Sequence, residues 1–169
     1  VQRGSTWYMQ VAARPLGGGN QQIGLLTSTD LATWAWGNSG APLITPGASG
    51  SWDEGFLGPG FGGININGLY IVPYLGSNAP STGIGDEPGT KRLGLLFSPD
   101  LVNWTKWGAN PILGLGPTGA FDTQALYRAA LVSAGGQVYL YYNAADAGGT
   151  ERIGYHLANV STGVHVPSS

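Results

Sequence analysis

The sequence has no cysteine and few charged residues. Asp, Glu, Lys and Arg make up 9% of its 169 residues, and the formal net charge is −2. Without cysteine, disulfide bonds and thiolate-based metal or redox sites are excluded. A protein that binds nucleic acid needs a basic surface to neutralise phosphates, and this chain has no basic stripe. We therefore expect no nucleic-acid partner.

Long apolar runs and helix-forming stretches are also missing. No run of about 18 apolar residues could span a bilayer as a helix, so we expect no membrane partner. The solvated faces of a helical bundle need many Lys and Glu residues, and an interior glycine costs a helix about 1 kcal/mol relative to alanine. These absences leave an all-β fold.

Glycine and aromatic residues, by contrast, are abundant. The 30 Gly and 11 Pro residues form about a quarter of the chain, a content that approaches that of disordered sequences. However, 42% of the residues are hydrophobic and 11% are aromatic, which is enough apolar material to build a core. The length is that of one domain, so we expect a single folded domain.

The chain repeats itself at a period of about 70 residues. Residues 23–34 (IGLLTSTDLATW) match residues 93–104 (LGLLFSPDLVNW), Trp52-Asp53 matches Phe121-Asp122, and residues 69–71 (LYI) match residues 138–140 (VYL). Each unit contains four short β-rich segments separated by turn signals, which is the pattern of one antiparallel sheet in a radial series.

The repeat predicts a propeller-like architecture of about three four-stranded antiparallel blades, as an open arc or as part of a larger or oligomeric propeller. The single domain then divides into a partial blade at 1–57, a blade at 58–120 and a blade at 121–169. The predicted strands of the two later blades lie at about 60–65, 69–75, 92–98, 104–107, 127–133, 137–143, 152–158 and 163–166.

Two repeated features favour structural roles. The turns at Ser28-Thr29-Asp30 and Ser98-Pro99-Asp100 each carry an Asp that is able to accept hydrogen bonds from nearby backbone N–H groups. Trp34 and Trp104 follow at equivalent positions, where we expect them to pack the blades.

The order of these signals resembles the blades of five-bladed propeller glycoside hydrolases, the arabinanases and xylosidases of family 43, with invertases and levansucrases as relatives. Residues 92–104 and 138–144 are the most typical segments. The resemblance implies a carbohydrate partner. We expect neither a cofactor nor a metal site, because His156 and His165 have no ligand at a suitable spacing. Fewer than three blades cannot close a ring, so the open faces predict self-association or contact with other propeller blades.

The resemblance also implies two catalytic carboxylic acids, one of them in an Asp-Pro pair on an inner strand shortly after the Trp-Asp element. In this chain Gly58 precedes Pro59, and Arg128 takes the corresponding place in the next unit. Neither unit therefore supplies the expected acid, and we favour a role other than catalysis.

The best remaining carboxylates are Asp53, Glu54 and Asp122, in loops that enter the inner strands. They are the candidates for residual acid chemistry, and Asp53 and Asp122 are also candidates for binding sugar hydroxyls. The alternative is that these two repeated Asp residues brace their loops by bonding backbone N–H groups. Glu54 has no acidic counterpart, because Thr123 aligns with it.

Three further residues complete the predicted ligand site. Trp52 and Phe121 offer aromatic faces on which a pyranose ring stacks. Arg128, on a predicted inner strand, needs a partner or a ligand such as an acidic sugar, unless it pairs with a carboxylate of this chain. The pair Asp86-Glu87 is a solvated charge pair or, with backbone carbonyls, a calcium contact.

Three functions remain open. The first is a non-catalytic carbohydrate-recognition or assembly module of an extracellular or surface-associated protein. The second is an arabinanase-, xylosidase- or fructosidase-like glycoside hydrolase, or a fragment of one, with acids supplied by missing blades or by another subunit. The third is a purely structural propeller module.

Overall fold

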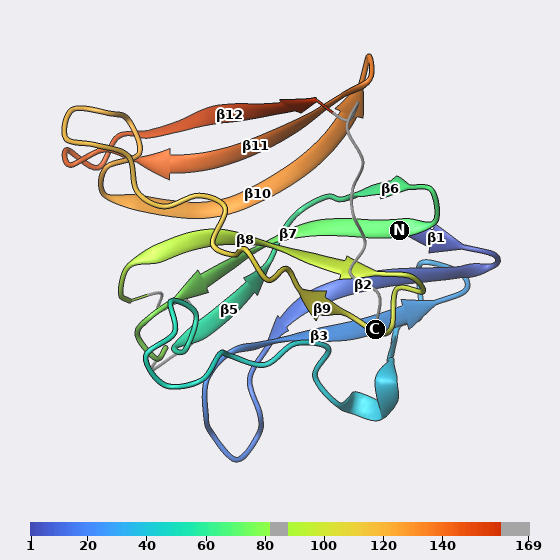
Figure 1. The fold of residues 1–169 in the computed structure, drawn as a ribbon. Coiled ribbons are helices and arrows are strands. Elements are labelled where there is room, and N and C mark those ends of the chain that lie inside the picture. The colour runs from blue at the N-terminus through green and yellow to red at the C-terminus, as the bar shows by residue number, and fades with distance from the viewer. Residues whose placement is uncertain (82–87, 160–169) are drawn as a thin grey trace.

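The computed structural model describes residues 1–81 and 88–159, which form three antiparallel sheets lying in successive layers (Figure 1). We name them sheets A, B and C in chain order. One short 3-10 helix, η1 (Asn38–Gly40), follows sheet A. The architecture confirms the predicted all-β, propeller-like fold. The predicted strand at 163–166 and the pair Asp86-Glu87 lie outside the described residues, as does His165.

In sheets A and C, strands that follow one another in the chain are neighbours, whereas in sheet B both β5 and β6 pair with β7. Sheet A contains β1 (Gln2–Arg3), β2 (Thr6–Ala13), β3 (Gln22–Ser28) and β4 (Ala35–Trp36). Sheet B contains β5 (Phe56–Pro59), β7 (Leu69–Ser77), β8 (Lys91–Ser98) and β9 (Thr105–Lys106), with β6 (Ile64–Ile66) also paired to β7. Sheet C contains β10 (Ala125–Ala134), β11 (Gln137–Ala145) and β12 (Glu151–Asn159).

The prediction of a continuous inner strand at 60–65 was wrong. The inner strand of sheet B begins at Phe56 and is interrupted between β5 and β6, where residues 60–63 turn toward sheet C. There Phe61 donates its N–H to the carbonyl of Ala129, and Leu131 donates to the carbonyl of Gly62. A Cβ on Gly60 would stand 2.8 Å from that Ala129 carbonyl, so glycine permits the crossing.

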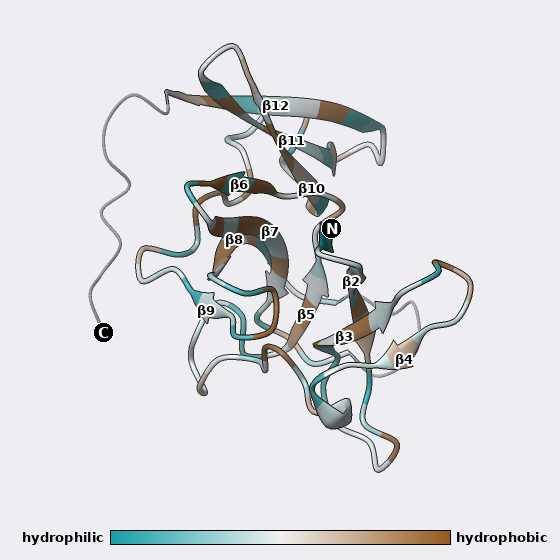
Figure 2. Ribbon diagram, turned by 90° about the vertical axis from the view of Figure 1, so that its right-hand side faces the viewer, coloured by the Kyte–Doolittle hydropathy of each residue, from teal (hydrophilic) through white to brown (hydrophobic). Residues whose placement is uncertain are grey.

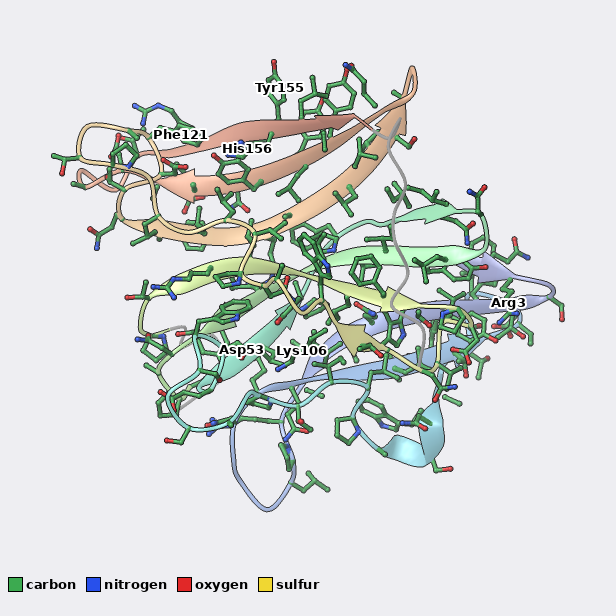
Figure 3. The ribbon with its side chains drawn as sticks, in the orientation of Figure 1. Arg3, Asp53, Lys106, Phe121, Tyr155 and His156 are labelled. Atoms are coloured by element: carbon green, nitrogen blue, oxygen red, sulfur yellow. The ribbon has the colours of Figure 1, made fainter. Side chains whose placement is uncertain are left out.

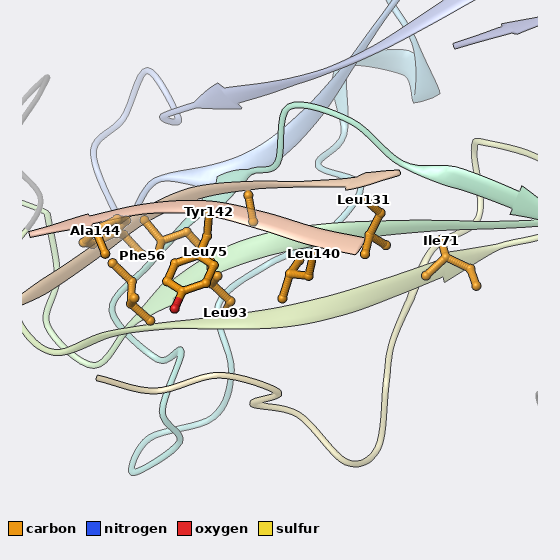
Figure 4. Packing of buried hydrophobic residues seen from close by; sticks show 10 residues of the cluster. Phe56, Ile71, Leu75, Leu93, Leu131, Leu140, Tyr142 and Ala144 are labelled. Carbon is orange, nitrogen blue, oxygen red and sulfur yellow. The ribbon is translucent and has the colours of Figure 1, made fainter. Parts of the chain in front are cut away.

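Two apolar clusters hold the layers together. Ile23 and Ile44 meet Leu57, Tyr74 and Leu96 between sheets A and B. A larger cluster fills the space between sheets B and C (Figure 4). Its buried members are Phe56, Ile71, Leu75, Leu93, Leu126, Ala129, Leu131, Leu140, Tyr142 and Ala144. Sheet B is covered on both faces, and Figure 2 shows the apolar colouring of β5, β7 and β8.

A glycine covered by an aromatic ring recurs in the equivalent strands β3, β8 and β12. A Cβ on Gly24 would stand 2.9 Å from the Trp36 ring, and one on Gly94 would stand 2.5 Å from the Tyr74 ring. Gly154 meets the ring of Phe121 in the same way. Each glycine therefore lets an aromatic side chain approach its sheet closely.

The repeated turns have the predicted form. Asp30 Oδ1 accepts the N–H groups of Ala32 and Thr33 at 2.9 and 2.7 Å, and Asp100 accepts from its two equivalent neighbours at the same distances. The hydrogen bonds from Thr33 and Ala32 lower the pKa of Asp30 to about 2. The structural role predicted for both Asp residues is confirmed. Trp104 packs against the cluster between sheets A and B.

We predict that Gly94→Ala destabilises the fold. Tyr74 is 1% exposed and has no room to retreat from the new methyl group, so the free energy of unfolding should fall by about 1–3 kcal/mol. Thermal and urea denaturation measure this change. Gly108→Ala is the matched control, because a Cβ at Gly108 meets nothing within 4 Å. Equal stability of the two variants would contradict the proposed packing constraint.

Candidate functional site

The candidate site comprises the two loops that lead into β5 and β10. These loops carry the predicted pairs Trp52-Asp53 and Phe121-Asp122. Figure 3 shows Asp53 and Phe121 at one end of the layered sheets and Arg3 at the other. The repeat therefore brings equivalent residues to the same end of successive sheets.

The carboxylate of Asp53 is 3% exposed and is occupied by three side chains. Its Oδ2 accepts the Tyr74 hydroxyl at 3.0 Å and lies 2.6 Å from the ammonium of Lys106. Its Oδ1 accepts the Ser51 hydroxyl at 3.2 Å. Asp53 thus fastens its loop to the second and fourth strands of sheet B.

Asp122 repeats this arrangement in sheet C. It is 6% exposed, and its Oδ2 accepts the Tyr142 hydroxyl at 2.9 Å. Both Asp residues brace their loops, but they do so through a tyrosine hydroxyl of the sheet, whereas the sequence predicted backbone N–H groups. Burial, together with the hydrogen bond from Tyr142 to Asp122, raises the pKa of Tyr142 to about 12. Burial and the charge of Asp53 also raise the pKa of Tyr74.

The neighbouring aromatic residues pack on the same tyrosines. The ring centroids of Trp52 and Tyr74 are 5.4 Å apart, and those of Phe121 and Tyr142 are 5.8 Å apart. Both Trp52 and Phe121 are half-buried. The ring centroids of His156 and Tyr142 are 5.6 Å apart, and the two rings are stacked. These contacts give the aromatic residues a packing role and leave part of each ring exposed.

Glu54 closes its own loop. Its Oε2 accepts the backbone N–H of Gly50 at 2.6 Å, and its carbonyl accepts the Asn20 amide at 3.2 Å. The side chain is half-buried. The structure therefore places all three candidate carboxylates in local hydrogen bonds within these loops.

Arg128 and Gly58, the two positions at which the sequence lacks an expected acid, lie against each other. A Cβ on Gly58 would stand 2.8 Å from the guanidinium carbon of Arg128. The register between β10 and β11 shifts around Arg128. The backbone N–H of Arg128 donates to the side-chain oxygen of Asn143 at 3.0 Å. Its guanidinium also donates to the carbonyl of Tyr127. An arginine side chain thus occupies the space between the two inner strands.

A hollow of about 460 Å³ opens beside Phe121. Thr123, Asp146 and Arg152 contribute polar groups to its wall. The Arg152 guanidinium lies 2.6 Å from Asp146, which also accepts the N–H groups of Gly148 and Thr150. The hydrogen bond from Arg152 lowers the pKa of Asp146. Sequence reasoning missed this pair, and its only signal was the shortness of the connection at 144–150.

A second hollow, of about 360 Å³, lies between sheets A and B. Its aromatic lining consists of Trp7, Tyr8, Trp34, Phe61 and Trp104. None of the predicted ligand residues reaches it. Its walls include Leu31 and Leu101 of the repeated turns, so it belongs to the region of those turns.

The described part of the chain contains no group of three or more His, Asp or Glu residues that could hold a metal ion. Among the same residues, no helix is long and apolar enough to cross a membrane.

Comparison with known proteins identifies the fold. No family model and no curated protein matches the chain. Among solved structures, a β-1,2-mannobiose phosphorylase from Listeria innocua matches with a TM-score of 0.71 and 18% identity, over 95% of this chain and 42% of that one. A family 117 glycoside hydrolase from Zobellia galactanivorans matches with a TM-score of 0.71 and 18% identity, over 93% of this chain and 49% of that one. A family 32 β-fructofuranosidase from Bombyx mori matches with a TM-score of 0.64 and 18% identity, over 91% of this chain and 30% of that one.

The predicted resemblance to propeller glycoside hydrolases is thus confirmed at the level of the fold. The chain spans less than half of the length of each of these structures. The fold is therefore that of part of a propeller.

We predict that Tyr142→Phe weakens the dependence of stability on alkaline pH. The raised pKa means that the folded chain keeps the phenolic proton between about pH 10 and pH 12, where the unfolded chain loses it. Stability from this group is therefore complete below pH 10 and decreases as the pH rises to 12. Denaturation series across this range measure the slope. Tyr155→Phe, at a tyrosine that is 61% exposed, should keep the parent slope. Identical slopes for all three proteins would contradict the assignment.

Proposed function

We propose that this chain is a non-catalytic carbohydrate-recognition module built from propeller blades. The observation that carries the proposal is the contact between Gly58 and Arg128. At the two inner-strand positions where the resemblance implies acids, one residue has no side chain and the other has a guanidinium that fills its space.

The charge at this position opposes glycoside hydrolysis. The transition state of that reaction resembles an oxocarbenium ion and is stabilised by a pair of carboxyl groups that flank the bond. The guanidinium of Arg128 is positively charged, whereas a carboxylate is negatively charged. The candidate acids Asp53 and Asp122 are buried and bonded to tyrosine hydroxyls, so they serve the loops.

The hollow beside Phe121 is the proposed sugar subsite. It joins part of an aromatic ring to the hydroxyl of Thr123 and to the Asp146–Arg152 pair. Aromatic faces pack on the C–H side of a pyranose, a carboxylate accepts hydrogen bonds from sugar hydroxyls, and a guanidinium donates hydrogen bonds to them. Trp52, at the equivalent position of the preceding sheet, is the second aromatic residue of the proposed surface.

Arg128 suits an acidic sugar at the inner strands, and Asp53 and Asp122 hold the aromatic residues of both loops in place. Carbohydrate names among the structural neighbours, including a complex with β-1,2-mannobiose, support this ligand class. Few charges and many aromatic residues suit a glycan-binding protein outside the cell or at its surface.

One alternative has its own support. The chain matches less than half of the length of neighbours named as glycoside hydrolases, so further blades or another subunit could supply the acids of a hydrolase. Hydrolytic activity that depends on such a partner is the distinguishing property of this alternative.

We predict that glycan arrays detect binding and that chromogenic arabinan, xylan and fructan substrates are not turned over by this chain. Turnover abolished by Asp53→Ala or Asp122→Ala would contradict the non-catalytic assignment. A negative result in both assays, with neither glycan binding nor substrate turnover, would favour a purely structural module.

We further predict that Arg152→Ala weakens binding of the best array glycan about tenfold, which corresponds to about 1.4 kcal/mol. The side chain of Arg152 is 49% exposed, so the melting temperature should stay close to that of the parent chain. Isothermal titration measures the affinity. Arg14→Ala is the matched control, because this arginine bonds only the nearby carbonyl of Gly19 among the described contacts. Equal affinity of both variants would place the subsite elsewhere.

A further inference from the structure

The outer face of sheet C is an exposed apolar surface. We call it the forward face and define it by Val132, Tyr139, Tyr141, Ile153, Tyr155 and Leu157. Strand register places these residues on one side of the sheet, because Val132 is opposite Tyr139, Tyr139 is opposite Leu157, and Tyr141 is opposite Tyr155. The three tyrosine rings contact one another, with centroids 5.8–6.1 Å apart.

The same positions are covered in the other two sheets. Ile153 and Tyr155 of β12 correspond to Leu93 and Leu95 of β8 in the repeat. Leu93 is fully buried and Leu95 packs into the cluster shared with sheet C. Ile153 is 78% exposed.

The equivalent face of sheet A is also covered. Its equivalent residues on β3 are Ile23 and Leu25, and they are 0% and 1% exposed. Ile23 packs into the cluster between sheets A and B. Two of three equivalent faces are therefore buried by a following sheet, and the third has the same apolar character but is not covered by any residue that the structure describes.

The opposite end of the layers carries a second apolar surface. We call it the backward face of sheet A and define it by Val11, Leu26 and Trp36, together with Met9, which also lines the hollow beside sheet B. Met9 is opposite Leu26, and Leu26 is opposite Trp36, so these side chains share one side of the sheet. Trp36 is 56% exposed and Met9 is 38% exposed.

This backward face is built like the faces that sheets B and C turn toward the preceding sheet. In sheet A the Trp36 ring covers Gly24, in sheet B the Tyr74 ring covers Gly94, and in sheet C the Phe121 ring covers Gly154. One chain thus presents both halves of the sheet-to-sheet interface that it forms twice internally.

We propose that two copies of this chain associate head to tail, with the forward face of sheet C of one copy against the backward face of sheet A of the other. The contact continues the A–B and B–C interfaces with the same kinds of side chain. The residues that define both faces are apolar or aromatic, so burying them desolvates no formal charge, and the one charged residue on the same side of β12 is Glu151 at its start. Three sheets from each copy give six, within the range of four to eight blades in which propellers close.

Sedimentation and light scattering test the association directly. The chain has a mass of 17.4 kDa, and we expect a species of twice that mass at micromolar concentration. Ile153→Arg on the forward face and Trp36→Arg on the backward face should each give monomers, because either substitution places a charge in both contacts of the ring. Leu16→Arg is the matched control, since Leu16 is fully exposed outside both faces, and it should remain a dimer.

Mixing the two monomeric variants identifies the pairing. In a head-to-tail dimer of the two variants, the native forward face of Trp36→Arg meets the native backward face of Ile153→Arg. Only one of the two contacts is then intact, so a dimer of lower affinity should reappear. If sheet C instead paired with sheet C, Trp36→Arg alone would stay dimeric and mixing would change nothing; that outcome overturns the proposal. Circular dichroism of each variant verifies folding.

A parent chain that remains a folded monomer at all concentrations would also overturn the proposal. In that case the faces are covered by blades of another polypeptide or of a longer one. Because the readout is mass, this result is independent of whether the chain binds or cleaves a carbohydrate.

Discussion

Close packing of aromatic rings on glycine is the constraint on which the rest of the structure depends. Gly24, Gly94 and Gly154 lack the Cβ that would hold Trp36, Tyr74 and Phe121 away from their sheets. Tyr74 belongs to the cluster between sheets A and B, and Phe121 packs against the cluster between sheets B and C, so this close approach occurs at both interfaces. The high glycine content is therefore required at defined places in a packed protein and does not indicate disorder.

The same packing determines the chemistry of the candidate site. Tyr74 and Tyr142 are held against their sheets, and their hydroxyls meet Asp53 and Asp122. A buried carboxylate requires such donors, so these acids are committed to the loops that carry Trp52 and Phe121. At the inner strands, the missing side chain of Gly58 accommodates the Arg128 guanidinium. A fold similar to that of glycoside hydrolases thus carries an arginine at a position where the resemblance implies an acid.

Repetition also explains the two ends of the layered sheets. Each sheet has a face adapted to the sheet before it and a face adapted to the sheet after it, and only sheet B meets both neighbours within the described residues. The terminal faces keep the apolar residues that the repeat specifies. Their exposure is a property of the arrangement rather than of their sequence, because Ile153 and the buried Leu93 occupy equivalent positions.

By itself, the sequence determined the repeat, the all-β propeller-like architecture and the bracing role of Asp30 and Asp100. These features depend on spacings of a few residues, which turn and strand preferences record directly. Only the tertiary structure decided the partners of Asp53 and Asp122, the contact of Gly58 with Arg128 and the break at residues 60–63. Those features join atoms 20 to 70 residues apart, where three-dimensional packing, and not local preference, selects the neighbour.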